Sequence, residues 1–167
     1  MAFLSRFSRV NALLCRWTMY LACVCLVGLL AVVVYGVVMR YVFNHAPPYV
    51  EQVALLLVIS VAMFGASAGV RDAGHIGLDS LVAKLPPAGQ FWCKVIVYLL
   101  VILFAVALFW GGAEMAVSTR SDSIPTLGIS EACRYLPVLA AGVLITLFSL
   151  EHLAAHFYRA EVVASWH

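Results

Sequence analysis

Residues 17–39 read WTMYLACVCLVGLLAVVVYGVVM, an apolar stretch that contains no charged side chain. A helix that spans a membrane needs about 20 mostly apolar residues, so this segment is long enough to cross a bilayer. Three further apolar stretches follow at residues 53–70, 91–113 and 135–157. We therefore predict an all-α integral membrane protein with four transmembrane helices.

The composition leads to the same class of protein. Of the 167 residues, 65% are hydrophobic and 11% are charged, whereas soluble domains have about 45–50% apolar and about 25% charged residues. Four spans and their loops fill the chain, which predicts a single membrane domain over residues 1–167. The net charge of +2 is too small to indicate a nucleic-acid partner.

Two shorter segments are amphipathic. In residues 2–16 and 74–87 the apolar side chains recur at helical spacing, with polar ones on the opposite side: Phe3, Phe7, Val10 and Leu14 in the first, Leu78, Leu81, Val82 and Leu85 in the second. This pattern is typical of helices that lie in the plane of the membrane surface. A signal peptide is the alternative for the N-terminus, but the apolar stretch that follows is too long for one.

The distribution of basic residues predicts the orientation. Lys and Arg accumulate on the cytoplasmic side of membrane proteins. The side that holds both termini has seven of them, and the other side has three: Arg6, Arg9, Arg16, Arg71, Lys84, Lys94 and Arg159 against Arg40, Arg120 and Arg134. We therefore expect both termini to be cytoplasmic.

Gly65 and Gly69 form a GxxxG step within the second span. Small residues at this spacing allow two membrane helices to approach closely. They could form a docking face for a partner protein, or they could pack inside the four-helix unit. The sequence leaves both interpretations open.

Charged residues flank the second span. Arg40 and Glu51 lie on either side of the first loop, where they could pair across the hairpin or remain two solvated charges. Arg71, His75 and Asp79 follow at a spacing of four residues at the other end. That spacing suits a ligand-binding or protonatable group, or a structural role at the membrane surface.

The last span carries Glu151, His152 and His156. A carboxylate in hydrocarbon needs a partner or a proton, and Arg16 or Arg71 could reach Glu151 on that side. The two histidines have a usable metal-ligand spacing, and with His75 they could hold a haem. A haem-binding anchor subunit of a respiratory dehydrogenase is therefore the alternative function.

No other pattern indicates catalysis. The sequence shows no nucleophile beside a base, no phosphate-binding glycine loop and no CxxC pair. No span breaks beside polar residues in mid-membrane, as the substrate-binding helices of transporters often do. We predict that the chain is not an enzyme, binds no cofactor or metal ion, and contains no complete transport pathway.

One run of residues resembles a known family. It consists of Arg40, Tyr41, Val42, Phe43 and Asn44, then Glu51, Gly65, Gly69 and Arg71, and finally His75, Ile76, Asp79, Leu85 and Pro86. Their order and spacing are similar to those of the small membrane subunit (DctQ-type, or Q subunit) of tripartite ATP-independent periplasmic (TRAP) transporters. Members often have a second acidic residue after the glutamate, where this chain has Gln52.

The resemblance implies a multi-pass protein of the bacterial inner membrane with two protein partners. A periplasmic binding protein captures an organic acid, and a large membrane subunit takes it up with sodium ions. The small subunit supports the large one within the lipid bilayer. The candidate residues for the partner interface are Gly65, Gly69, Arg40, Glu51, Arg71, His75 and Asp79.

Overall fold

A computed structural model describes residues 2–72 and 86–158. It contains four long helices and one short 3-10 helix: α1 (Ala2–Tyr41), α2 (Tyr49–Asp72), α4 (Pro87–Ser118), η1 (Glu131–Tyr135) and α5 (Leu136–Phe157). All four long helices are long and apolar enough to cross a membrane. The prediction of an all-α protein with four such helices is confirmed.

Proline residues mark where the helices begin. Pro47 and Pro48 separate α1 from α2, because proline lacks an N–H group and restricts the residue before it. Pro87 and Pro137 lie in the first turns of α4 and α5, where the missing N–H would have no intrahelical partner. Ser130 caps η1 by accepting a hydrogen bond from Ala132 N.

The N-terminal segment differs from the expectation. Residues 2–16 do not form a separate in-plane helix but continue into the first span as one helix of 40 residues, about 60 Å long. No proline or glycine interrupts residues 2–27, and Asn11 and Cys15 on the polar side are buried. Part of the polar side therefore packs against protein, whereas Arg6 and Arg9 are exposed. The other predicted in-plane helix, residues 74–87, lies almost entirely outside the described residues.

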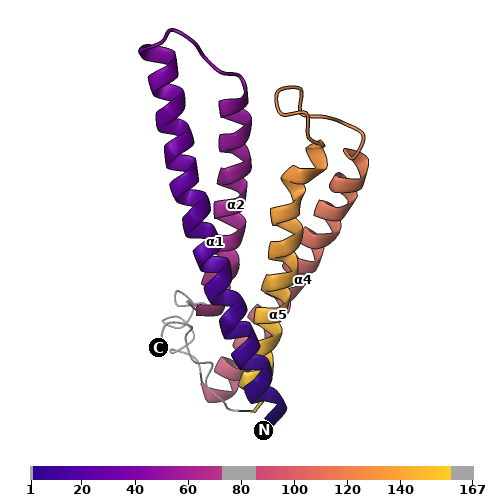
Figure 1. The fold of residues 1–167 in the computed structure, drawn as a ribbon. Coiled ribbons are helices and arrows are strands. Elements are labelled where there is room, and N and C mark those ends of the chain that lie inside the picture. Colours follow the sequence, from indigo (N-terminus) through magenta and orange to yellow (C-terminus); the bar gives the residue numbers. More distant parts are fainter. Residues whose placement is uncertain (1, 73–85, 159–167) are drawn as a thin grey trace.

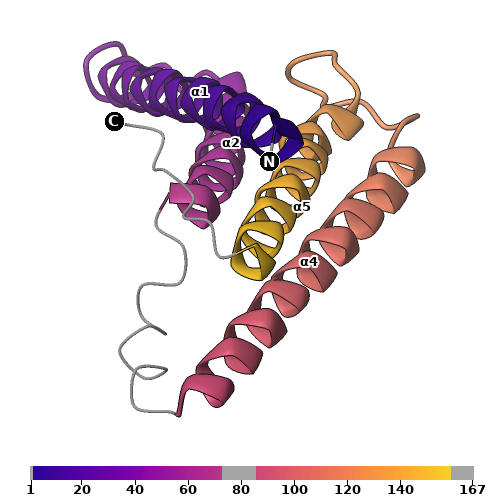
Figure 2. The same ribbon diagram turned by 90° about the horizontal axis from the view of Figure 1, so that it is seen from below.

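The helices form two hairpins. The α1–α2 hairpin and the α4–α5 hairpin converge at the end that holds the N-terminus and diverge toward the two loops (Figure 1). Helices α2 and α5 pack on each other in the middle, with α1 against α2 and α4 against α5 (Figure 2). We call the converging end the Arg71 end, and the end with residues 42–48 and 119–130 the loop end.

Small residues set the closest helix contacts. A Cβ atom on Gly142 of α5 would lie 2.9 Å from Phe109 Cβ and 3.1 Å from the Ala105 carbonyl oxygen of α4. A Cβ on Gly36 of α1 would lie 2.7 Å from Val50 of α2. Without a side chain the backbones approach closely, which is how membrane helices gain van der Waals contact.

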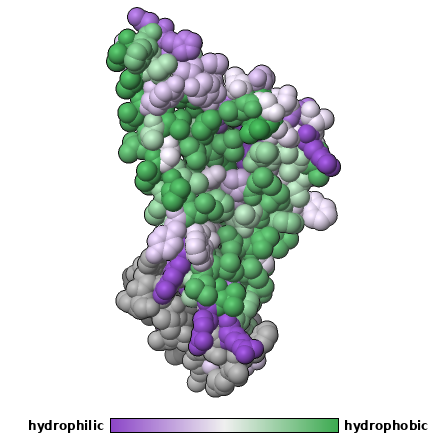
Figure 3. Space-filling model, viewed as in Figure 1, coloured by the Kyte–Doolittle hydropathy of each residue, from purple (hydrophilic) through white to green (hydrophobic). Residues whose placement is uncertain are grey.

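The outer helices expose large apolar side chains. Space-filling atoms show a hydrophobic middle with hydrophilic residues gathered toward the two ends (Figure 3). The exposed residues on α1 and α4 include Trp17, Val24, Val27, Leu30, Trp92, Leu103, Phe104 and Trp110. Water would solvate this surface poorly, so lipid or another protein must cover it.

Candidate functional site

A buried ion pair joins α2 to α5 at the Arg71 end. Arg71 Nε donates to Glu151 Oε2 at 3.2 Å, and Arg71 Nη2 donates to Glu151 Oε1 at 3.1 Å. The two side chains are only 0% and 2% exposed. This two-pronged geometry is the strongest form of an arginine–carboxylate contact. Of the two arginines that the sequence offered as partners of Glu151, Arg71 is the one that pairs with it.

Helix α1 completes the surroundings of this pair. Asn11 Nδ2 donates to Glu151 Oε2 at 2.9 Å, and Asn11 itself is 1% exposed. Arg71 Nη2 also donates to the carbonyl oxygen of Ser8 at 3.4 Å. Three helices that are far apart in the sequence therefore meet at one carboxylate and one guanidinium.

Further polar groups surround Arg71. Its Nη1 donates to Asp72 Oδ1 at 3.2 Å, and the thiol of Cys15 lies 3.6 Å from Asp72 Oδ2. His152 Nε2 lies 2.8 Å from the Arg71 carbonyl oxygen. We call Asn11, Arg71, Asp72, Glu151 and His152 the Arg71 cluster. Its charged groups pair with one another inside the subunit, so its chemistry fits a helix clamp rather than a reacting group.

The two histidines lie between α4 and α5. His152 stacks on Tyr98 with the rings nearly parallel, and His156 stacks on Phe91 with ring centroids 4.7 Å apart. A carbonyl oxygen only accepts, so the ring nitrogen of His152 that faces Arg71 carries the hydrogen and has no lone pair for a metal. His75, the third residue of the haem hypothesis, lies outside the described residues. Across residues 2–72 and 86–158, no three metal-binding side chains gather.

Gly65 and Gly69 lie on an open face of α2. A Cβ atom on either glycine would meet no described atom within 4 Å, and the neighbouring Ala62 and Ala66 are exposed. We call these four residues the small-residue face. Ser67, by contrast, is fully buried and belongs to the inner side of α2.

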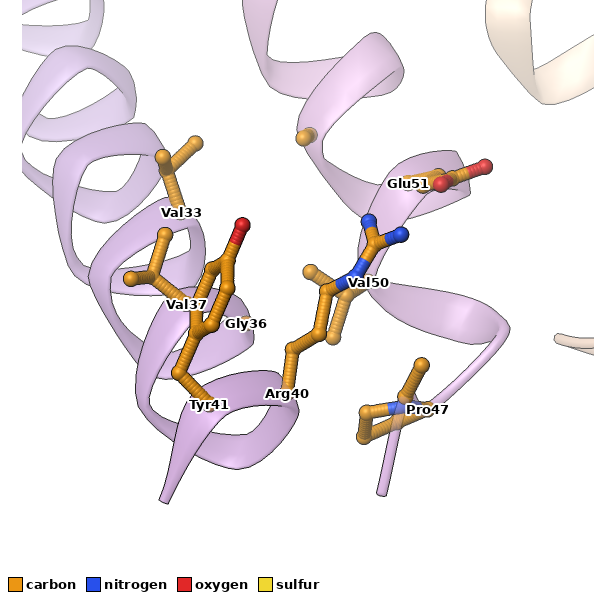
Figure 4. Close-up of a pocket in the computed structure, with 10 residues that line it drawn as sticks. Val33, Gly36, Val37, Arg40, Tyr41, Pro47, Val50 and Glu51 are labelled. Carbon is orange, nitrogen blue, oxygen red and sulfur yellow. The ribbon is translucent and has the colours of Figure 1, made fainter. Parts of the chain in front are cut away.

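Arg40 and Glu51 line one groove at the loop end. Figure 4 shows the Arg40 side chain reaching from α1 across the groove toward Glu51 on α2. Both residues are exposed, and no nitrogen–oxygen contact within 4.0 Å joins them. The groove has a volume of about 330 Å³ and is lined by Val33, Gly36, Val37, Arg40, Tyr41, Ala46, Pro47, Val50, Glu51 and Ala54.

The structure therefore separates the predicted interface residues. Gly65, Gly69, Arg40 and Glu51 lie on open surfaces, whereas Arg71 points inward. His75 and Asp79 lie outside the described residues. The sequence interpretation missed Asn11, because its contact with Glu151 depends on which helices pack together. It also missed Gly142, whose contact with α4 depends on helix pairing.

The fold and these sites define a class, that of multi-pass helical membrane proteins that are built around a structural ion pair. Residues 29–159 match the family of tripartite ATP-independent periplasmic transporters, DctQ component. The chain belongs to this family. It is a TRAP transporter small permease subunit, a non-catalytic component that lies in the inner membrane.

Relatives in Haemophilus influenzae agree with this assignment. One protein described as a TRAP transporter small permease protein is 26% identical over 144 residues, covering 84% of this chain and 89% of its own length. A second with the same description is 22% identical over 134 residues, covering 78% and 81%. Family membership favours the transport function over the haem-anchor alternative.

Proposed function

We propose that this subunit anchors and supports the large TRAP membrane subunit during sodium-driven uptake of an organic acid delivered by a periplasmic binding protein. Family membership supports the tripartite assembly. Two features of this chain support a scaffolding role rather than a transport role. Its buried arginine and glutamate pair within the subunit, and its outer helices expose a large apolar surface that a partner protein or lipid can cover.

The observation that carries the proposal is the open small-residue face of α2. Ala62, Gly65, Ala66 and Gly69 follow one another at short spacings that return to the same side of a helix, so they form one stripe. No described residue of the chain fills the space in front of either glycine. Close backbone contact drives helix association in lipid, so this stripe suits a helix of the large subunit.

The test is a Gly65→Leu substitution in the assembled transporter. A leucine would hold the partner helix away, so we expect less copurified large subunit and slower uptake, with the small subunit itself present at its normal amount. Gly142→Leu is the matched control, because it disturbs packing inside the subunit and should lower that amount. Unchanged assembly and uptake in Gly65→Leu would rule out the docking face.

We further propose that both termini face the cytoplasm. The helices place the N-terminus and the end of α5 on the same side (Figure 1), and the sequence pattern assigns more basic residues to that side than to the other. Reporter fusions after His167 should therefore report a cytoplasmic position, and fusions at Ser121 a periplasmic one. The opposite pattern would refute this orientation.

A further inference from the structure

We propose that the groove between α1 and α2 at the loop end binds a phospholipid whose headgroup carries both a phosphate and a primary ammonium. The proposal is independent of the docking face proposed on α2. It rests on the two opposite charges of Arg40 and Glu51, on the apolar wall beneath them, and on the level at which they lie in the membrane.

The two charges are available to a ligand. Arg40 lies in the last turn of α1, and Glu51 lies in the first turn of α2. Within the described part of the chain, neither side chain forms an ion pair or a side-chain hydrogen bond. The same two residue types at the Arg71 end pair directly. Arg40 and Glu51 instead both line one groove, Arg40 from α1 and Glu51 from α2 (Figure 4).

A phosphoethanolamine headgroup complements this arrangement. A guanidinium donates charge-assisted hydrogen bonds to phosphate oxygens, and a carboxylate accepts them from an ammonium. An anionic headgroup without an amine would satisfy only Arg40 and would bring its negative charge toward Glu51. A quaternary ammonium has no N–H to donate to Glu51. The charge pair therefore selects a headgroup with a primary amine.

The wall of the groove fits an acyl chain. Val33 and Val37 descend from Arg40 along α1, and Val50 and Ala54 face them from α2. Val33 lies seven residues before Arg40, about 10 Å deeper along the helix. Tyr41, next to Arg40, is 77% exposed, and tyrosine favours the headgroup level of membranes. The charges therefore lie where headgroups lie, and the valines lie where hydrocarbon begins.

The experiment measures which lipids stay on the purified transporter complex. The complex is placed in nanodiscs that contain equal amounts of phosphatidylethanolamine, phosphatidylcholine and phosphatidylglycerol, and retained lipids are counted by native mass spectrometry. We expect phosphatidylethanolamine to be enriched on the wild type. Arg40→Gln should lower retention of all three about five-fold, whereas Glu51→Gln should abolish only the preference for phosphatidylethanolamine.

Controls separate the lipid from other occupants. Arg120→Gln removes an exposed cation from the other loop and should leave the lipid pattern unchanged. Ala54→Phe narrows the apolar wall and should displace lipid while both charges remain. Equal lipid retention in Arg40→Gln, Glu51→Gln and wild type would overturn the proposal. So would a loss of large-subunit copurification at unchanged lipid retention, because the groove would then hold protein.

Discussion

An arginine and a glutamate lie on neighbouring helices at both ends of this subunit, in opposite physical situations. At the Arg71 end, Arg71 and Glu151 are buried, bonded through two atom pairs and surrounded by Asn11 and Asp72. At the loop end, Arg40 and Glu51 are exposed across a groove without a direct contact. One pair joins the hairpins, and the other leaves an open surface between α1 and α2.

The difference shows that residue type does not fix the role of a charged pair. A buried charge is costly unless it is paired and hydrogen-bonded, so Arg71 and Glu151 depend on each other. An exposed charge near the headgroups keeps its solvation and contributes little to folding. Burial therefore predicts which charges maintain the fold and which remain free to meet lipid or partner.

The largest expected effect is that of Glu151→Ala. This change leaves the Arg71 guanidinium buried without its carboxylate, so the free energy of unfolding should fall by about 3–5 kcal/mol. Glu51→Ala removes the same group from the exposed pair and should change it by less than about 0.5 kcal/mol. Unfolding of the two variants in detergent measures the contrast.

A double variant sharpens this comparison. Arg71→Met combined with Glu151→Leu removes both charges, and it should recover much of the stability that Glu151→Ala loses, because the buried arginine–glutamate pair is removed as a whole. If Glu151→Ala is as stable as Glu51→Ala, the buried pair does not hold the hairpins together.

Asn11→Ala should have a smaller effect than Glu151→Ala. Asn11 donates to a charged oxygen of Glu151 in a fully buried position, and such a bond contributes about 1.5–3 kcal/mol. The matched change at the loop end is Gln52→Ala, which removes the 2.9 Å bond from Arg134 Nη2. Both of those side chains are partly exposed, so we expect the free energy of unfolding to fall by at most about 1 kcal/mol. Equal losses in detergent unfolding would contradict the difference in burial.

The smallest expected effect distinguishes inner from outer glycines. In Gly142→Ala the new Cβ would meet Phe109 and the Ala105 carbonyl. The free energy of unfolding should fall by about 1–2 kcal/mol, after the better helix propensity of alanine is counted. Gly69→Ala meets open space and should be neutral or stabilising by up to about 1 kcal/mol. Thermal unfolding of the isolated subunit tests both, and a destabilised Gly69→Ala would place that glycine inside the unit.

Part of the site could be predicted from the sequence. A carboxylate within an apolar span needs a partner, so the position of Glu151 is enough to predict a nearby arginine. The sequence could not decide whether Arg16 or Arg71 pairs with Glu151, because that depends on which helices pack together. The same reason hid Asn11, which bonds Glu151 across 140 positions of sequence.

The amphipathic pattern of residues 2–16 was read correctly as helical but placed wrongly. Periodicity shows that a helix has a polar side, and it does not show what covers that side. In the structure, Asn11 and Cys15 are covered by protein, because the long α1 continues past α2 and contacts α5.

Four helical membrane spans could be predicted from the sequence, since the lengths of apolar stretches and the positions of prolines are local properties. The family could be predicted as well, through the order of residues from Arg40 to Pro86. The tertiary structure was needed to show that Arg71 is a buried clamp, that Arg40 and Glu51 share a groove, and that Gly65 and Gly69 face outward. Each of these facts depends on the pairing and rotation of helices, which contacts between distant residues set.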